Sequence, residues 1–130
     1  MPEIITFGKS DIGLKRFNNE DAFVAKPEKG LLVVADGMGG AAAGEVASKI
    51  FAETAVEVFS ETGRGAEKET LELIQRAFQL ANERILKRAS QNPQYEGMGC
   101  TAELMTFSNQ KYLLGHVGDS RTYLLREGQL

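Results

Sequence analysis

The most informative part of the sequence is the stretch Leu31-Leu32-Val33-Val34-Ala35-Asp36-Gly37-Met38-Gly39-Gly40. Its first five residues are apolar and include two β-branched valines, which predicts a buried strand over 31–35. The apolar run stops at Asp36, and the glycines that follow let the backbone come close to whatever the carboxylate holds. A strand that ends in a carboxylate can present a metal ligand or a catalytic acid. A glycine-rich turn in which Asp36 accepts hydrogen bonds from local amides explains the stretch equally well at this point.

A second strand precedes this stretch. Residues 21–25 include Ala22-Phe23-Val24-Ala25, which predicts a strand, and residues 26–30, Lys-Pro-Glu-Lys-Gly, predict a hairpin turn. The turn would lay the strand over 21–25 antiparallel to the strand over 31–35. In such a hairpin the start of the first strand lies beside the end of the second.

This pairing would bring three carboxylates together. Glu20 and Asp21 begin the first strand and are expected near Asp36. Acids that converge in this way repel one another unless a cation lies between them. The alternative is a solvated loop in which Arg16 and Lys15 neutralise the acids. The metal site is favoured because glycines follow Asp36 and because Asp36 lies at the end of a strand.

The rest of the chain predicts helices followed by strands. Apolar residues at helical spacing predict helices over 44–59 and 70–89, with Thr70 as a candidate N-cap and a loop over 60–68 between them. Further strands are expected at 3–7, 100–107, 111–117 and 121–126, with turns at 108–110, 118–120 and Glu127-Gly128. This order predicts an α+β fold in which a helix pair packs on an antiparallel sheet.

Composition narrows the class of protein. The chain has 130 residues, 42% hydrophobic and 25% charged, which fits one domain over 1–130. The net charge of −3 offers nucleic acid or an anionic membrane no overall attraction, so neither is expected as a partner. The N-terminus lacks the pattern of a signal peptide, and we expect a cytoplasmic protein. Cys100 is the single cysteine, which excludes an intramolecular disulfide and a cysteine-rich zinc site.

A dinucleotide-binding loop is a rival explanation of the glycines. Residues 37–42 satisfy G-x-G-x-x-A after a strand and before a helix. The fold that uses this loop needs a parallel strand after the helix, ending in an acid that holds the ribose. Here a loop and another helix follow, and Asp36 would repel the incoming pyrophosphate. We therefore rank this explanation well behind the metal site.

Four motifs together resemble the bacterial branch of the metal-dependent type 2C (PPM-type) protein phosphatases. They are Arg16-x-x-Asn19-Glu20-Asp21-Ala22, Val34-Ala35-Asp36-Gly37-Met38-Gly39-Gly40 with Gly44-Glu45, Gly99-Cys100-Thr101-Ala102, and His116-Val117-Gly118-Asp119-Ser120-Arg121. The resemblance implies a serine/threonine phosphatase built as an antiparallel β-sandwich flanked by helix pairs (α-β-β-α). Members hydrolyse phosphoester bonds of phosphorylated proteins with two Mn²⁺ or Mg²⁺ ions and a bridging water that attacks phosphorus.

The resemblance also implies a role for each acid. Asp36 would bridge the two ions, the backbone carbonyl of Gly37 would add a ligand, and Glu20 and Asp21 would contribute directly or through waters. Asp119 is a candidate ligand for a third, weaker ion. Oxygen-only ligands independently favour Mg²⁺ or Mn²⁺ over zinc.

Arg16 would clamp the substrate phosphate, since its planar guanidinium matches two phosphate oxygens. The residue that would protonate the leaving group is not assigned. His116 is the single histidine, yet its place near the end of an apolar strand favours a structural role. The eukaryotic branch has a histidine at the position of Met38, which cannot donate a proton. Cys100 is better explained by packing than as a nucleophile, because Thr106 stands where cysteine-based phosphatases have arginine.

The resemblance covers about half of the family domain, whose later S-D-G and D-N motifs do not occur after Asp119. We therefore expect the N-terminal half of the domain, with sheet edges and an apolar sheet face uncovered. It would be a fragment, or a short form that associates with itself or another chain. The alternative function is a non-catalytic module that keeps the phosphatase shape and binds a phosphoprotein or another partner.

Overall fold

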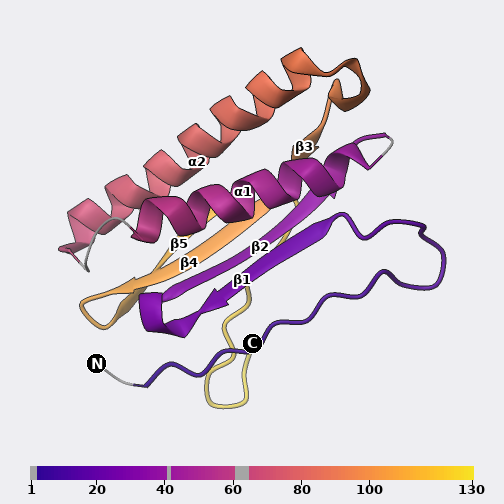
Figure 1. Ribbon diagram of the computed structural model, residues 1–130. Coiled ribbons are helices and arrows are strands. Elements are labelled where there is room, and N and C mark those ends of the chain that lie inside the picture. The colour runs from indigo at the N-terminus through magenta and orange to yellow at the C-terminus, as the bar shows by residue number, and fades with distance from the viewer. Residues whose placement is uncertain (1–2, 41, 61–64) are drawn as a thin grey trace.

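The computed structural model describes residues 3–40, 42–60 and 65–130, which form one sheet with two helices on the same face (Figure 1). The strands are β1 (Asp21–Lys26), β2 (Leu31–Met38), β3 (Gly99–Cys100), β4 (Ala102–Ser108) and β5 (Lys111–Val117). The α-helices are α1 (Ala43–Ser60) and α2 (Glu67–Gln91), and two short 3₁₀ helices are η1 (Pro27–Lys29) and η2 (Pro93–Tyr95).

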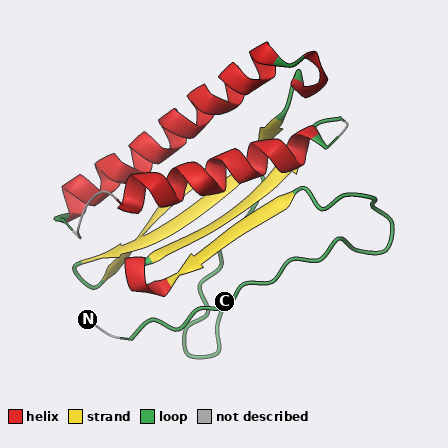
Figure 2. Cartoon of the chain, viewed as in Figure 1, coloured by secondary structure: helices red, strands yellow, loops and turns green. Residues whose placement is uncertain are grey.

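All strand pairs are antiparallel. The sheet order is β1-β2-β4-β5, and β3 pairs with the end of β2 (Figure 2). This confirms the predicted α+β class with a helix pair on an antiparallel sheet. The dinucleotide-binding explanation is wrong, because α1 leads into α2 and not into a parallel strand.

The β1–β2 hairpin forms as predicted and sets the register of the site. The turn is η1 followed by Gly30, whose φ of 59° lies in the left-handed region. The register places Asp21 opposite Asp36. One detail differs, because β2 does not end before Asp36 but continues to Met38. The extension forms because Gly37 and Met38 find partners in β3, far away in the sequence.

The core lies between the sheet and the two helices. Alternate residues of β2, namely Leu31, Val33 and Ala35, are buried against this side. The helix predicted over 44–59 is confirmed as α1, and its Phe51 packs edge-on against Phe78 of α2 with ring centroids 5.0 Å apart. The apolar stripes of both helices are therefore core packing.

The second helix differs from the prediction at its ends. It begins at Glu67 with Ala66 as N-cap, so Thr70 is not the N-cap. Thr70 lies in the first turn, where its hydroxyl donates to the Ala66 carbonyl at 3.0 Å. The predicted loop at 60–68 falls partly on residues 61–64, outside the described residues. Within the described part of the chain, no helix combines the length and apolarity needed to cross a membrane.

Two predicted strands do not form. Residues 3–7 and 121–126 have strand composition but no ladder partner in the structure, and the second of these contributes only the bridge between Arg126 and Gln129. The turn predicted at Glu127-Gly128 is confirmed, with both residues at positive φ. The strand predicted over 100–107 divides into β3 and β4 at Thr101.

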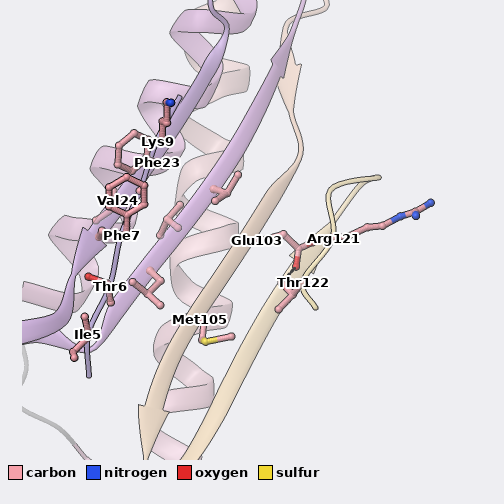
Figure 3. Close-up of a pocket in the computed structure, with 15 residues that line it drawn as sticks. Ile5, Thr6, Phe7, Lys9, Phe23, Val24, Glu103, Met105, Arg121 and Thr122 are labelled. Atoms are coloured by element: carbon pink, nitrogen blue, oxygen red, sulfur yellow. Dashed lines mark hydrogen bonds between the residues drawn. The ribbon is translucent and has the colours of Figure 1, made fainter. Parts of the chain in front are cut away.

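The sheet face away from the helices is open. Phe23, Val34 and Leu114 are 43%, 52% and 41% exposed on it. A groove of about 500 Å³ runs over this face, with Ile5, Thr6 and Phe7 on one side and Arg121 and Thr122 on the other (Figure 3). The uncovered apolar face expected from the sequence is confirmed.

We predict that the two faces of the sheet differ in their contribution to stability. Leu104 of β4 is fully buried under the helices, so Leu104→Ala should lower the free energy of unfolding by about 2–5 kcal/mol. Leu114→Ala, the same change on the open face of the neighbouring strand, should cost less than half as much. Urea titration followed by circular dichroism measures both, and equal losses would contradict the assignment of the core.

Candidate metal and phosphate site

A polar cavity of about 230 Å³ lies at the end of the β1–β2 hairpin where β1 begins and β2 nears its end. Its lining comes from the loop before β1 and from the two strands. The lining residues are Asp11, Ile12, Arg16, Asn18, Asn19, Glu20, Asp21 and Asp36. The loop is held to the strand by Asn19, whose amide donates to Ser10 Oγ at 2.7 Å and whose Oδ1 accepts from the Asp21 amide at 3.1 Å.

The centre of the cavity is the carboxyl pair of Asp21 and Asp36. The two residues are register partners on adjacent antiparallel strands, and their side chains are within hydrogen-bonding reach. Burial raises the pKa of Asp21 above its ordinary value, and the hydrogen bond to Asp36 and the negative charge of Asp36 raise it further. Arg16 acts in the opposite direction. Two acids in this arrangement favour a proton or a cation between them.

Glu20 is held in the same cavity through its backbone. Its carbonyl accepts hydrogen bonds from the Gly37 amide at 3.0 Å and from the Ser48 hydroxyl of α1 at 2.6 Å. Its side-chain atom Oε2 is buried without a hydrogen-bond partner. A buried carboxylate oxygen without a donor is costly, so this atom marks a second place where a cation is favourable.

Glycine lets the first turn of α1 approach β2 at the site. A Cβ on Gly44 would lie 2.7 Å from the backbone carbon of Gly37 and would overlap Glu20 Oε2. A Cβ on Gly37 would lie 2.8 Å from the Glu20 carbonyl oxygen and would overlap that of Gly44. The close backbone approach that these glycines allow is to the N-terminal turn of α1, whereas the expected approach to a ligand of Asp36 stays a prediction.

Thr101 supports Asp36 from the other side. The Thr101 amide donates to the Asp36 carbonyl at 2.8 Å, and the Asp36 amide donates to Thr101 Oγ1 at 3.2 Å. Sequence reasoning did not single out Thr101 or Ser48 as contributors to the site. Thr101 belongs to the Gly99–Ala102 motif, and Ser48 lies one helical turn after Gly44, but both contacts join residues far apart in the chain.

The structure brings together four of the predicted site residues, namely Arg16, Glu20, Asp21 and Asp36, with Gly37 adjoining them. Arg16 is exposed at the cavity, where its charge opposes the rise in the pKa of Asp21 that burial and Asp36 cause. Asp119 is exposed and does not line the cavity. Its segment meets the site at Thr101, whose hydroxyl contacts that of Ser120 and whose side chain lies against Gly118.

The carboxyl groups that line the cavity fit a hard divalent cation. Carboxylate oxygens are ligands that Mg²⁺ and Mn²⁺ prefer. The Asp21–Asp36 pair and Glu20 Oε2, which has no hydrogen-bond partner, gather negative charge that Arg16 opposes. Among residues 3–40, 42–60 and 65–130, however, no three His, Cys, Asp or Glu side chains already form a metal-binding group. The ligand roles of these residues therefore stay a prediction.

Two other side chains considered for catalysis, those of His116 and Cys100, make structural contacts outside the cavity. His116 Nδ1 contacts Glu103 Oε1 on the neighbouring strand, which supports the structural role favoured for this histidine. Burial raises the pKa of the Cys100 thiol to about 11, and the charge of Asp36 adds to the shift. The Cys100 Sγ donates to the Ala47 carbonyl at 3.8 Å, so this residue packs against α1. A thiol in this state is a poor nucleophile.

Comparison with known proteins finds relatives over most of the chain. The model of the family described as "Protein phosphatase 2C" matches residues 8–130. The serine/threonine protein phosphatase PstP of Mycobacterium tuberculosis is 40% identical over 122 residues, which cover 94% of this chain and 23% of PstP. The protein phosphatase PhpP of Streptococcus pneumoniae is 31% identical over 120 residues, which cover 90% of this chain and 48% of PhpP.

Solved structures show the same fold. The catalytic domain of PstP in complex with 2 manganese ions superimposes with a TM-score of 0.83 at 40% identity, covering 92% of this chain and 50% of that domain. The chain thus spans at most about half the length of the relatives it matches.

We predict that Gly44→Ala damages the site, whereas Gly40→Ala does not. The added methyl at residue 44 has to displace Glu20 or separate α1 from β2, while at residue 40 nothing lies within 4 Å. The first variant should unfold at a lower temperature, by an amount equivalent to about 1–3 kcal/mol, and the second should match the wild type. Thermal unfolding measures both, and an unchanged Gly44→Ala would contradict the close contact.

We also predict that Cys100 is unreactive in the folded chain. With a pKa of about 11, only about one thiol in ten thousand is ionised at pH 7. Iodoacetamide should therefore modify the folded chain at least about tenfold more slowly than the chain unfolded in urea. Mass spectrometry after timed quenching measures the two rates. Equal rates would show that the thiol is neither buried nor raised in pKa.

Proposed function

Because this chain belongs to the protein phosphatase 2C family, we propose that it is the N-terminal part of a metal-dependent serine/threonine protein phosphatase. The reaction would be hydrolysis of phosphoserine and phosphothreonine esters in proteins. The solved PstP domain that it resembles holds two manganese ions. For this chain we propose two Mn²⁺ or Mg²⁺ ions at the Asp21–Asp36 pair, with ligands also from Glu20 and the Gly37 carbonyl, and a weaker third ion at Asp119.

The observation that carries the proposal is the juxtaposition of Asp21 and Asp36 in a cavity lined also by Arg16. The acids alone would suit any hard cation. The guanidinium beside them adds a fork of donors that matches two oxygens of a phosphate monoester. A site that combines anionic ligands for cations with a cationic ligand for phosphate is suited to phosphoester hydrolysis.

Each residue has a defined task in this reaction. Arg16 would bind and orient the phosphate above the acid pair. The ions, when bound, supply a water of lowered pKa and offset negative charge on the phosphate. Hydrogen bonds of Gly37 and Thr101 fix the main chain at Asp36 and so set where its carboxylate begins. Met38 has no proton to donate, and His116 is engaged with Glu103, so neither is proposed as the acid that protonates the leaving group.

The narrower sequence predictions form part of this proposal. They are a cytoplasmic location, no nucleic-acid or membrane partner, and self-association if the chain is naturally this short. The net charge of −3 supports the second of these.

The test is hydrolysis of p-nitrophenyl phosphate during titration with Mn²⁺. It is run on this chain and, where the gene encodes further residues, on its full product. We expect metal-dependent turnover that Asp36→Asn lowers at least about 100-fold, because the variant loses the charge that holds the ions. Arg16→Ala should raise KM for the phosphate substrate more than it lowers kcat.

Glu28→Gln is the matched control, since it removes one exposed carboxylate at the opposite end of the same hairpin. It should leave turnover and Mn²⁺ affinity within about twofold of the wild type. If Asp36→Asn retains full turnover in an active protein, Asp36 does not hold the ions. Phosphoprotein binding without turnover in the full product would favour the non-catalytic module.

A further inference from the structure

Glu103 of β4 is a buried carboxylate that the proposed reaction does not use. It is 8% exposed and lies on the open face of the sheet, between Val34 of β2 and His116 of β5 in the strand register. An ionised carboxylate is costly at such a position unless donors compensate it.

Both oxygens of Glu103 have partners. Oε1 contacts His116 Nδ1, and Oε2 accepts a hydrogen bond from the Thr122 hydroxyl at 2.7 Å. Figure 3 shows the Glu103 and Thr122 side chains directed toward one another, while Arg121, the residue before Thr122, points away. Glu103 therefore ties the chain that follows β5 to the surface of the sheet.

The other end of this chain segment is held by Thr101. The Thr101 and Ser120 hydroxyls contact each other, and Gly118 turns with a φ of +95° directly against the Thr101 side chain. A Cβ on Gly118 would lie 2.6 Å from Thr101 Cγ2, so only glycine allows this approach. Thr101 Oγ1 accepts from the Asp36 amide and can donate its own proton to Ser120.

We propose that Thr101 and Glu103 clamp residues 118–122 at both ends and thereby hold Asp119 in a constant position relative to Asp36. Both are positioning residues, because they act on Asp119 through the contacts of Ser120 and Thr122. The assignment of Asp119 as a ligand rests on the proposed function. The clamp itself rests on the contacts of Thr101, Ser120, Glu103 and Thr122.

The clamp explains why this segment needs side-chain contacts. Residues 118–122 belong to no strand, so ladder hydrogen bonds do not restrain Asp119. A flexible segment would lose conformational entropy each time Asp119 engaged a cation, which weakens the ligand. Ordering the segment in advance removes that loss. Thr101 directly precedes β4, and Glu103 is the second residue of β4. Because β4 pairs with β2 and Thr101 bonds to Asp36, both clamping residues are fixed relative to β2 and Asp36.

The decisive comparison is Thr122→Val against Thr122→Ser. Valine keeps the shape of threonine and lacks the hydroxyl, whereas serine keeps the hydroxyl. Backbone ¹⁵N relaxation of the metal-free chain, measured by NMR, should give order parameters of about 0.85 at 118–122 in the wild type and below about 0.6 in Thr122→Val. Thr122→Ser should return these order parameters to the wild-type values, and those of α1 should be unchanged in both variants.

Ser120→Ala tests the other end in the same way and should also lower the order parameters at 118–122. Thr122 and Ser120 lie outside the core, so these variants should fold. If the order parameters at 118–122 are the same in Thr122→Val, Ser120→Ala and the wild type, the clamp is wrong. If serine fails to restore what valine loses, the hydroxyl contact to Glu103 is not what holds the segment.

Calorimetric titration with Mn²⁺ then tests the consequence for Asp119. Thr122→Val should weaken the weakest Mn²⁺ site about tenfold and leave tighter sites unchanged, and Asp119→Asn should remove that weakest site. Lower order parameters with unchanged weak-site affinity would overturn the link to Asp119. If the wild-type chain and its full product bind no Mn²⁺ at all, the proposed function fails, and the relaxation comparison still decides whether the clamp exists.

Discussion

The arrangement of the molecule depends on two acids that face each other across a hairpin. Asp21 and Asp36 are register partners on adjacent strands, where like charges destabilise a sheet. The rest of the hairpin opposes this repulsion, because alternate residues of β2 are buried under the helices and the η1 turn sets the register. A slip by one residue would separate the acids, but it would also turn the buried residues of β2 to the open face.

Helix α1 and Thr101, which lies between β3 and β4, hold the main chain around these two acids. From one side α1 presses its first turn onto β2, which requires glycine at residues 37 and 44, and its Ser48 holds the carbonyl of Glu20. From the other side Thr101 bonds both backbone groups of Asp36. The contacts are made to the main chain, so they leave the carboxylates available for other partners. This is the property that a site for cations and phosphate needs.

The two faces of the sheet have different chemistry. The covered face is apolar and close-packed, whereas the open face combines exposed apolar side chains with the Glu103–His116–Thr122 contacts. The burial of Glu103 costs stability unless its partners are present, so its contacts specify where the segment after β5 lies. The relatives that share this fold are at least about twice as long as the part of them that this chain matches.

Sequence patterns that involve only neighbouring residues were sufficient to predict most helices and strands of this protein. Alternation predicted the paired strands, helical spacing predicted both helices, and the hairpin placed Asp21 beside Asp36, because each depends on neighbours within one turn or one hairpin. Other features depended on residues far apart in the chain. Residues 3–7 and 121–126 read as strands but lack partners, β2 was lengthened by β3, and Thr101 and Ser48 reached the site from distant elements. Ladder pairing and side-chain contacts between distant segments are set by how the layers pack, and only the tertiary structure decides them.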